Sequence, residues 1–408
     1  MTNSKIAQNA TWLMALQISS YIVPFLLLPY LTRTLGAEAF GELAVGWAVA
    51  AYLAIFADFG FYLWGVKESA ICRDDKDRLS ALWSTIQSVK LVLLGLSLPV
   101  MLTAAYIADS SPYLYLFLWL ALAGQTLVPG WLYQGMERSF WFLVFNISAQ
   151  VAAAVATVAV VSSPSDLIYV PLCSALSWVA LTMAANVHAV KSFGIAPRIP
   201  VVASLKAAFA GSYPLFSANI WVAFYVNLPA LAVGFLSARS EAGLFVGAQK
   251  IILAAQALFT PISSAIFPRI SALAAGDRHN ALAFFKKAAL YTLPVMAVGC
   301  LMAFVLSDFV ISLILGTGFE KSAELLSIMA FGPLLVAANM LLANHLIVAF
   351  GHSKKLPKIY AFTAVAALVF VPALVLLFGS YGAAASYMFV ELLVFAMLLR
   401  VASKISFS

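Results

Sequence analysis

The sequence predicts an all-α, polytopic membrane protein with about twelve transmembrane helices. Three observations predict this fold class. The chain of 408 residues is 64% hydrophobic and only 10% charged, whereas a soluble domain has about 25% charged residues. Apolar runs of about 20 residues, which is the length that crosses a bilayer, recur from one end of the chain to the other. The Lys and Arg residues also gather in alternate connections between these runs.

Each apolar run defines one predicted span. The spans lie at residues 9–31, 41–66, 81–108, 113–135, 140–162, 167–190, 209–236, 243–267, 288–306, 325–350, 358–378 and 381–400. The first run is too long for the core of a signal peptide and has no obvious cleavage site, so we expect it to be a retained helix. Prolines within the spans are compatible with membrane helices, because neighbouring groups satisfy the carbonyls that they free.

The distribution of Lys and Arg predicts the orientation of the chain. If the N-terminus lies in the cytoplasm, 18 of the 23 Lys and Arg residues fall in cytoplasmic segments and only 3 in outer loops. Cytoplasmic loops of membrane proteins are enriched in these residues. The sequence therefore predicts that both termini lie in the cytoplasm.

The overall charge and the reactive residues exclude several classes of function. The net charge of +7 is explained by cytoplasmic loops, so nucleic acid is not an expected partner. Three Cys and four His residues are scattered over the chain without the spacing of a disulfide framework or a metal site. No catalytic or nucleotide-binding motif occurs, and the loops leave no room for an ATPase domain. We therefore expect no enzyme activity, no metal and no cofactor. The driving force is either an ion gradient, with a proton or Na⁺ as the candidate coupling ion, or the gradient of the substrate.

A weak internal repeat relates the two halves of the chain. Residues 37–41 and 240–243 have similar sequences, and each follows a Leu-Pro pair near the end of a span. The offset is about half the chain, so each half would hold six helices inserted in the same direction, as in transporters built from parallel repeats. The alternative is a chance similarity between two turns. We predict two pseudo-symmetric six-helix bundles around a central cavity, at residues 1–200 and 201–408.

Four charged residues lie well inside the predicted spans, away from the span ends, and each costs at least about 2.5 kcal/mol there. They are Asp58, Lys90, Lys250 and Glu391. Lys90 either faces a polar cavity or forms a buried pair with Asp58. Lys250 either faces a cavity or extends to the outer headgroups. Asp58 either braces a helix end or takes part in ion coupling, and Glu391 is either a hydrogen-bonded packing residue or a proton carrier.

Several short motifs resemble those of bacterial polysaccharide transporters in the multidrug/oligosaccharidyl-lipid/polysaccharide exporter superfamily, above all the O-antigen repeat-unit flippase group. Their order and spacing match along the whole chain. They lie at residues 29–36, 38–41, 58–60, 131–137, 242–245, 248–251 and 267–270. One departure concerns the seventh helix, where some relatives have an acidic residue and this chain has the sequence Tyr225-Val226-Asn227.

The resemblance implies a flippase that moves an oligosaccharide linked to undecaprenyl pyrophosphate from the cytoplasmic to the periplasmic leaflet by alternating access. Membrane lipid, and the polymerase and chain-length proteins of the same pathway, are the implied partners. Because a pyrophosphate needs cationic partners when it leaves water, we predict basic residues for substrate binding and acidic residues for ion coupling. The predicted substrate-binding residues are Arg33, Lys90, Arg239, Lys250 and Arg269. The predicted ion-coupling residues are Asp58 and Glu391.

Two further functions compete with this interpretation. A cation-coupled multidrug antiporter of the same superfamily would favour an acidic, aromatic cavity over a basic one. A membrane-embedded polysaccharide polymerase or ligase usually needs a substantial periplasmic loop, and the longest outer loop predicted here covers only residues 307–324.

Overall fold

The computed structural model describes residues 3–406, except for the side chains of residues 3–8, 10, 218–219 and 405–406. Every regular element in the described part is a helix. The elements of the N-terminal half are α1 (Asn3–Asp58), α2 (Phe61–Ile71), α3 (Lys76–Ile107), α4 (Pro112–Leu127), α5 (Gly130–Gly135), α6 (Ser139–Val160), the short 3₁₀ turn η1 (Pro164–Asp166), α7 (Tyr169–Phe193) and α8 (Val202–Leu236).

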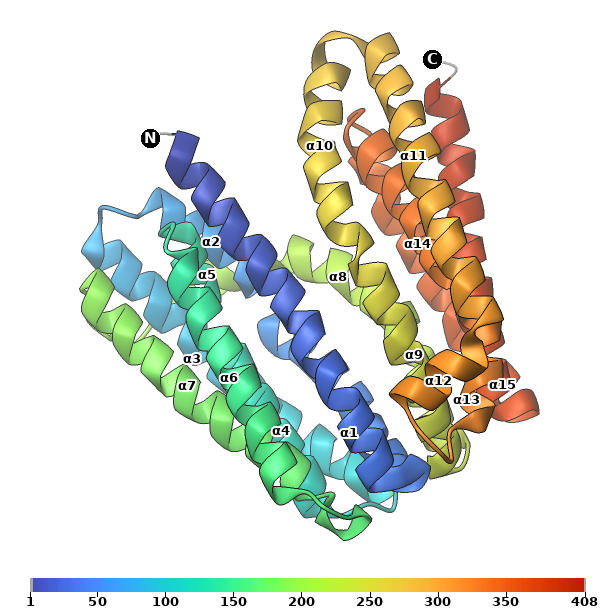
Figure 1. Ribbon diagram of the computed structural model, residues 1–408. Helices are drawn as coiled ribbons and strands as arrows, with labels where there is room; N and C mark the ends of the chain where they lie inside the picture. Colours follow the sequence, from blue (N-terminus) through green and yellow to red (C-terminus); the bar gives the residue numbers. More distant parts are fainter. Residues whose placement is uncertain (1–2, 407–408) are drawn as a thin grey trace. The chain divides into compact units, whose positions relative to one another are not determined.

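The C-terminal half continues with helices of more varied length. Its elements are α9 (Arg239–Ala257), α10 (Phe259–Gly276), α11 (Arg278–Val305), α12 (Ser307–Ile314), α13 (Glu320–Met329), α14 (Gly332–Met340), the π-helix η2 (Leu341–Val348), the 3₁₀ turn η3 (Ser353–Lys355) and α15 (Leu356–Ser406). Figure 1 shows α10 and α11 as a contacting antiparallel pair, with α14 packed against α11.

The helices account for the predicted spans. In the described part of the chain, nine helical stretches are long and apolar enough to cross a membrane, and the bent helix 202–236 is a tenth. Two of the nine exceed 50 residues and break at glycines with positive φ, Gly36 and Gly379. Each of these two long stretches covers two predicted spans, so the twelve predicted spans are all represented. The all-α membrane fold is therefore confirmed.

Close contacts divide the chain into two compact units. Unit 1 consists of Met1–Tyr30 and Val45–Ala223, and unit 2 consists of Leu31–Ala44 and Phe224–Ser408. The segment Leu31–Ala44 belongs to unit 2 although it lies within α1, because its turn packs against the beginning of α9. The bundle boundary expected at residue 200 stays a prediction.

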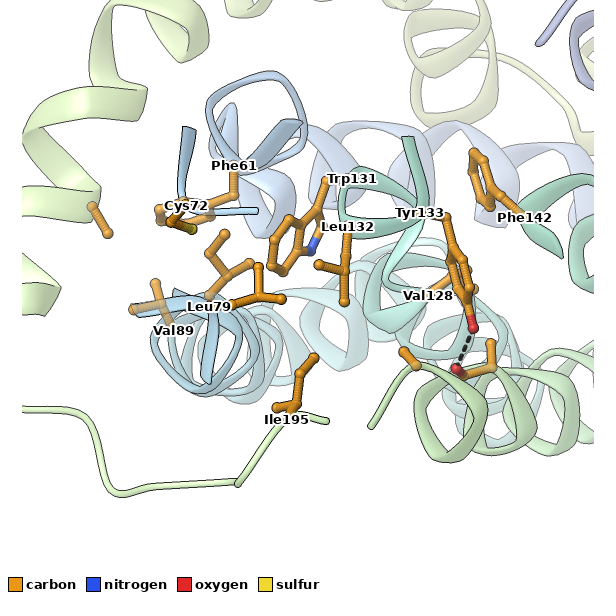
Figure 2. Close-up of a cluster of buried hydrophobic side chains, with 14 of the residues drawn as sticks. Phe61, Cys72, Leu79, Val89, Val128, Trp131, Leu132, Tyr133, Phe142 and Ile195 are labelled. Carbon is orange, nitrogen blue, oxygen red and sulfur yellow. Dashed lines mark hydrogen bonds between the residues drawn. The ribbon is translucent and has the colours of Figure 1, made fainter. Parts of the chain in front are cut away.

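The core of unit 1 is built around Trp131, whose indole is fully buried between α2 and α3. Figure 2 shows Trp131 and Leu132 at the centre of this cluster, with the Tyr133 hydroxyl donating to the carbonyl of Ala185 at 2.7 Å. Gly65 makes this packing possible, since a Cβ there would lie 2.8 Å from the Trp131 ring. Small residues commonly let membrane helices approach in this way, because lipid provides no hydrophobic driving force between helices.

Candidate functional site

A buried ion pair lies at the centre of unit 1. The ammonium of Lys90 on α3 donates to Asp58 Oδ1 at 2.7 Å and to the backbone carbonyl of Thr126 at 3.1 Å. The Lys90 side chain is only 3% exposed, whereas that of Asp58 is 33% exposed. Of the two arrangements that the sequence left open for Lys90, the structure shows the pair with Asp58.

Both partners of Lys90 belong to the ends of broken helices. Asp58 is the last residue of α1, and the chain then turns through Phe59 and Gly60, which have φ values of 45° and 77°. Thr126 lies in the last turn of α4, which breaks before α5. The last carbonyls of a helix have no partner within it and carry the negative end of its dipole. The Lys90 ammonium therefore satisfies a carbonyl at the C-terminal end of α4 and pairs with the carboxylate of the last residue of α1.

Amide side chains complete the break between α4 and α5. Gln87 and Asn186 each donate to the carbonyl of Leu127 at 3.1 Å, and Gln87 also donates to Asn186 Oδ1 at 2.6 Å. One turn earlier, Thr182 donates to the carbonyl of Gly124 at 2.7 Å. Irregular backbone at membrane depth is tolerated where protein groups satisfy it. The polar residues near Lys90 thus hold the broken helix together.

Unit 2 contains a buried carboxylate in a different environment. Glu391 on α15 is 6% exposed. Asn339 on α14 donates to Glu391 Oε2 at 2.9 Å and to its backbone carbonyl at 3.2 Å. The other amide atom, Asn339 Oδ1, is buried without a hydrogen-bond partner. The Asn339 amide thus donates to Glu391 and keeps a buried acceptor oxygen of its own.

Tyrosines surround this carboxylate. Tyr225, Tyr360 and Tyr387 all lie close enough to Glu391 to interact with it electrostatically. The rings of Tyr225 and Tyr360 are 6.4 Å apart, and the hydroxyl of Tyr387 accepts a hydrogen bond from Gln256 Nε2. Tyr225 occupies the segment in which some relatives have an acid. In this chain the residue there interacts electrostatically with the acid on α15.

The Glu391 cluster has the chemistry of a site for a small cation. A carboxylate, an amide oxygen and phenol oxygens are hard ligands, which favour protons and alkali or alkaline-earth ions over soft metals. Among the described residues, no group of three or more His, Cys, Asp or Glu side chains could hold a metal ion. The oxygens of this cluster are therefore of the kind that can take up a proton or Na⁺.

Arg33 lines a pocket at one end of unit 2. The pocket has a volume of about 740 Å³ and is formed by Arg33 together with residues of α12, α13 and the loop between them. The guanidinium donates to the carbonyl of Leu313 at 2.6 Å, and Gly316 lies against its aliphatic part. Asp308 and Glu320 place carboxylates on the same wall. The pocket offers both donors and acceptors to a polar ligand.

The remaining predicted basic residues lie on α9 and α10. Arg239 is half-buried and contacts Glu42 at 3.4 Å. Lys250 is half-buried three turns further along α9, and Arg269 is exposed on α10. All three belong to unit 2. Their predicted role in substrate binding stays a prediction, as do the roles of Arg33 and Lys90.

Sequence reasoning missed the surroundings of Glu391 and the walls of the Arg33 pocket. One signal was present, since Tyr387 precedes Glu391 by four residues and thus shares its helix face. The pocket had a weaker signal, namely the charges Asp308 and Glu320 in the longest predicted outer loop. No signal could place Tyr225 or Tyr360 beside Glu391, because Tyr225 lies on α8 and Tyr360 lies before the break of α15 at Gly379.

The chain matches one known protein family over more than half of its length. Residues 6–274, more than half of the chain, match the family described as "Polysaccharide biosynthesis protein". The chain belongs to this family. Over 404 residues it is 24% identical to the "Putative O-antigen transporter" of Escherichia coli (strain K12), covering 98% of this chain and 97% of that protein. The protein of the same name from Shigella dysenteriae is 25% identical over 401 residues, which are 96% of this chain and 99% of that one.

Solved structures of transporters share the fold of this family member. An inward-facing multidrug resistance MATE family transporter of the MOP superfamily has a TM-score of 0.74 at 12% identity, covering 98% of this chain and 96% of that one. The lipid II flippase MurJ, in an inward closed conformation, has a TM-score of 0.70 at 14% identity, covering 95% and 87%. At these identities the two structures show a shared fold with this chain.

Proposed function

We propose that this protein is a flippase for a lipid-linked oligosaccharide, an O-antigen or related repeat unit carried on undecaprenyl pyrophosphate. It moves the substrate from the cytoplasmic to the periplasmic leaflet by alternating access. The observation that carries this proposal is the full-length match to two proteins named as O-antigen transporters. Family and relatives are transport proteins, so the chain is a transporter rather than an enzyme.

Basic residues of unit 2 support an anionic substrate. A pyrophosphate cannot enter an apolar environment unless its charge is paired. Arg33 and Arg239 offer guanidinium groups, which bind phosphate in a bidentate manner, and Lys250 and Arg269 add further positive charge along α9 and α10. The hydroxyl-rich sugar needs mixed donors and acceptors, which the pocket beside Arg33 contains.

Glu391 is the proposed site of ion coupling. Its burial and its neighbour Asn339, whose Oδ1 has no partner, favour transient uptake of a proton or Na⁺. Uptake of a cation there neutralises a buried charge, which gives the two conformations of a transporter different stabilities. Some relatives have an acidic residue in the seventh helix, where this chain has Tyr225-Val226-Asn227 on α8. In this chain Glu391 on α15 provides a carboxylate close enough to Tyr225 to interact with it electrostatically.

The setting of the reaction follows from the substrate. We place the protein in the bacterial inner membrane with both termini in the cytoplasm, which the distribution of Lys and Arg supports. Membrane lipid surrounds it, and the polymerase and chain-length proteins of the same pathway are its proposed partners. The likeness to a multidrug transporter, at 12% identity, concerns the fold alone.

Deletion of the gene tests the function directly. Loss of a flippase leaves lipid-linked repeat units inside the cell and none on the surface, whereas loss of a polymerase leaves single repeat units on the surface. Complementation with Lys250→Ala or Arg269→Ala should restore insertion but impair export. Arg78→Ala is the matched control, since Arg78 is 74% exposed beside Asp75. Normal surface polysaccharide with both test variants would refute recognition by these cations.

A further inference from the structure

Unit 1 contains a group of oxygens with the composition of a cation site. Asp58 Oδ1 and the carbonyl oxygen of Thr126 both face one point between α1, α3 and α4. Each belongs to the C-terminal end of a broken helix. In transporters with discontinuous helices, such helix ends and freed carbonyls coordinate Na⁺ or protons. The donor set therefore points to a monovalent cation.

The point where these oxygens meet is already occupied by a positive charge of the protein itself. The Lys90 ammonium lies 2.7 Å from the carboxylate oxygen and 3.1 Å from the carbonyl oxygen, and its side chain is 3% exposed. Like Na⁺, an ammonium is a compact charge that oxygens surround. It differs in being tethered, so it cannot be exchanged with the solution.

We propose that Asp58 and the Thr126 carbonyl form a monovalent-cation site whose permanent occupant is Lys90. Given the proposed transport function, unit 1 then takes up no coupling ion during the cycle, and coupling is confined to unit 2. Under this proposal Asp58 positions Lys90 and does not bind the coupling ion. Of the two predicted ion-coupling residues, Glu391 alone then binds it. Removal of the ammonium should convert the site into a Na⁺ site.

The contrast with unit 2 supports this assignment. Glu391 belongs to none of the ion pairs formed by the residues that the structure describes. Its neighbour Asn339 keeps an acceptor oxygen without a partner. Lys90, by comparison, would leave Asp58 without its counter-ion and the Thr126 carbonyl without this donor if it moved away. Unit 1 thus carries its own cation, whereas the buried carboxylate of unit 2 has no ion-pair partner among the described residues.

Sodium-dependent thermal stability of the purified full-length protein tests the proposal. All variants carry Glu391→Gln, so that binding in unit 2 does not contribute. The Glu391→Gln protein should melt at the same temperature in sodium chloride and in choline chloride. Adding Lys90→Ala should produce a saturable rise in melting temperature with sodium, and further addition of Asp58→Asn should abolish that rise. A Lys90→Ala variant that folds and is indifferent to sodium overturns the proposal.

A second measurement avoids dependence on the folding of Lys90→Ala. Equilibrium binding of radioactive sodium is compared between the wild type and Asp58→Asn/Lys90→Met, in which no buried charge is left unpaired. Equal sodium binding by both supports the proposal, and lower binding by the double variant overturns it. Neither measurement requires the lipid-linked substrate. Failure here is therefore distinct from failure of the proposed function, which appears as an unchanged distribution of repeat units after gene deletion.

Discussion

The backbones of Gly41 and Gly243 lie directly against each other in unit 2. A Cβ on Gly41 would lie 1.8 Å from the carbonyl oxygen of Arg239, and one on Gly243 would lie 2.1 Å from that of Ala37. The two glycines occupy matching positions in the weak internal repeat, at residues 37–41 and 240–243. The two similar turns thus pack onto each other, and each supplies the glycine that the other needs.

Gly41→Ala should disrupt this crossing. No side-chain rotation can relieve a clash with a backbone carbonyl, so α1 and α9 would have to separate. We expect the free energy of unfolding to fall by about 3 kcal/mol or more, which is large for a single substitution. A fall in the melting temperature of the purified protein measures this loss. Gly243→Ala should behave alike.

The matched control for this crossing is Gly95→Ala. Gly95 lies within α3 and is exposed, and a Cβ added there would meet no other atom within 4 Å. Alanine is favoured over glycine in a helix by up to about 1 kcal/mol, so this variant should be unchanged or slightly more stable. Equal melting temperatures for Gly41→Ala and Gly95→Ala would contradict the close crossing.

Arg33→Ala should loosen the end of α12. The guanidinium donates to the Leu313 carbonyl, which is one of the last four of that helix and lacks a helical partner. Because Arg33 is exposed, we expect a cost of only about 1 kcal/mol. Amide hydrogen exchange over residues 313–318 should accelerate about fivefold, the factor that corresponds to this energy. Arg33→Lys keeps the positive charge but lacks the planar guanidinium, so its exchange rate should lie between those of the wild type and Arg33→Ala. Unchanged exchange in Arg33→Ala would argue against the contact.

Asp277 should make the start of α11 sensitive to acid. Its carboxylate accepts hydrogen bonds from the Asn280 backbone at 3.0 Å and from the Asn280 side chain at 2.6 Å. The backbone bond is the main reason that the pKa of Asp277 lies below its ordinary value. A lowered pKa stabilises the folded cap above the ordinary value of about 3.9, and this contribution is lost as pH falls through the folded pKa.

Amide exchange at Asn280, followed over that pH range, measures the effect. Protection should decrease towards low pH in the wild type. Asp277→Asn keeps a good cap but cannot ionise, so its protection should not change with pH. Since Asp277 is exposed, added salt should weaken the wild-type dependence. A pH-independent wild type would show that the carboxylate does not cap α11.

The helices could be predicted from the sequence because hydrocarbon imposes a simple rule. Spans need about 20 apolar residues, and cytoplasmic loops attract Lys and Arg. No comparable rule predicts where a helix breaks inside a span. The π-helix at Leu341–Val348, inside the predicted span 325–350, has no distinct signal in composition. Positions of breaks depend on which neighbouring side chains satisfy the freed carbonyls.

Candidate site residues could be predicted one at a time, but most of their partners could not. A charge inside an apolar run is visible in the sequence, so Lys90 and Glu391 were both identified. Whether such a charge faces a cavity or a counter-ion depends on contacts between separate helices. Lys90 and Asp58 are 32 residues apart, and Asn339 and Glu391 are 52 apart. Helical periodicity relates residues three or four positions apart and cannot predict contacts between residues so far apart in the sequence.

Glu391→Gln should uncouple transport from its driving ion while leaving the fold intact. The Gln side chain keeps a carbonyl oxygen that accepts from Asn339 Nδ2, so the link between α14 and α15 survives. It cannot bind a proton and holds Na⁺ weakly, because it lacks the charge. Flipping measured in proteoliposomes should therefore lose its dependence on a proton or sodium gradient. Glu38→Gln, at an exposed position, is the control and should retain the dependence. If Glu391→Gln still responds fully to both gradients, a different group carries the coupling ion.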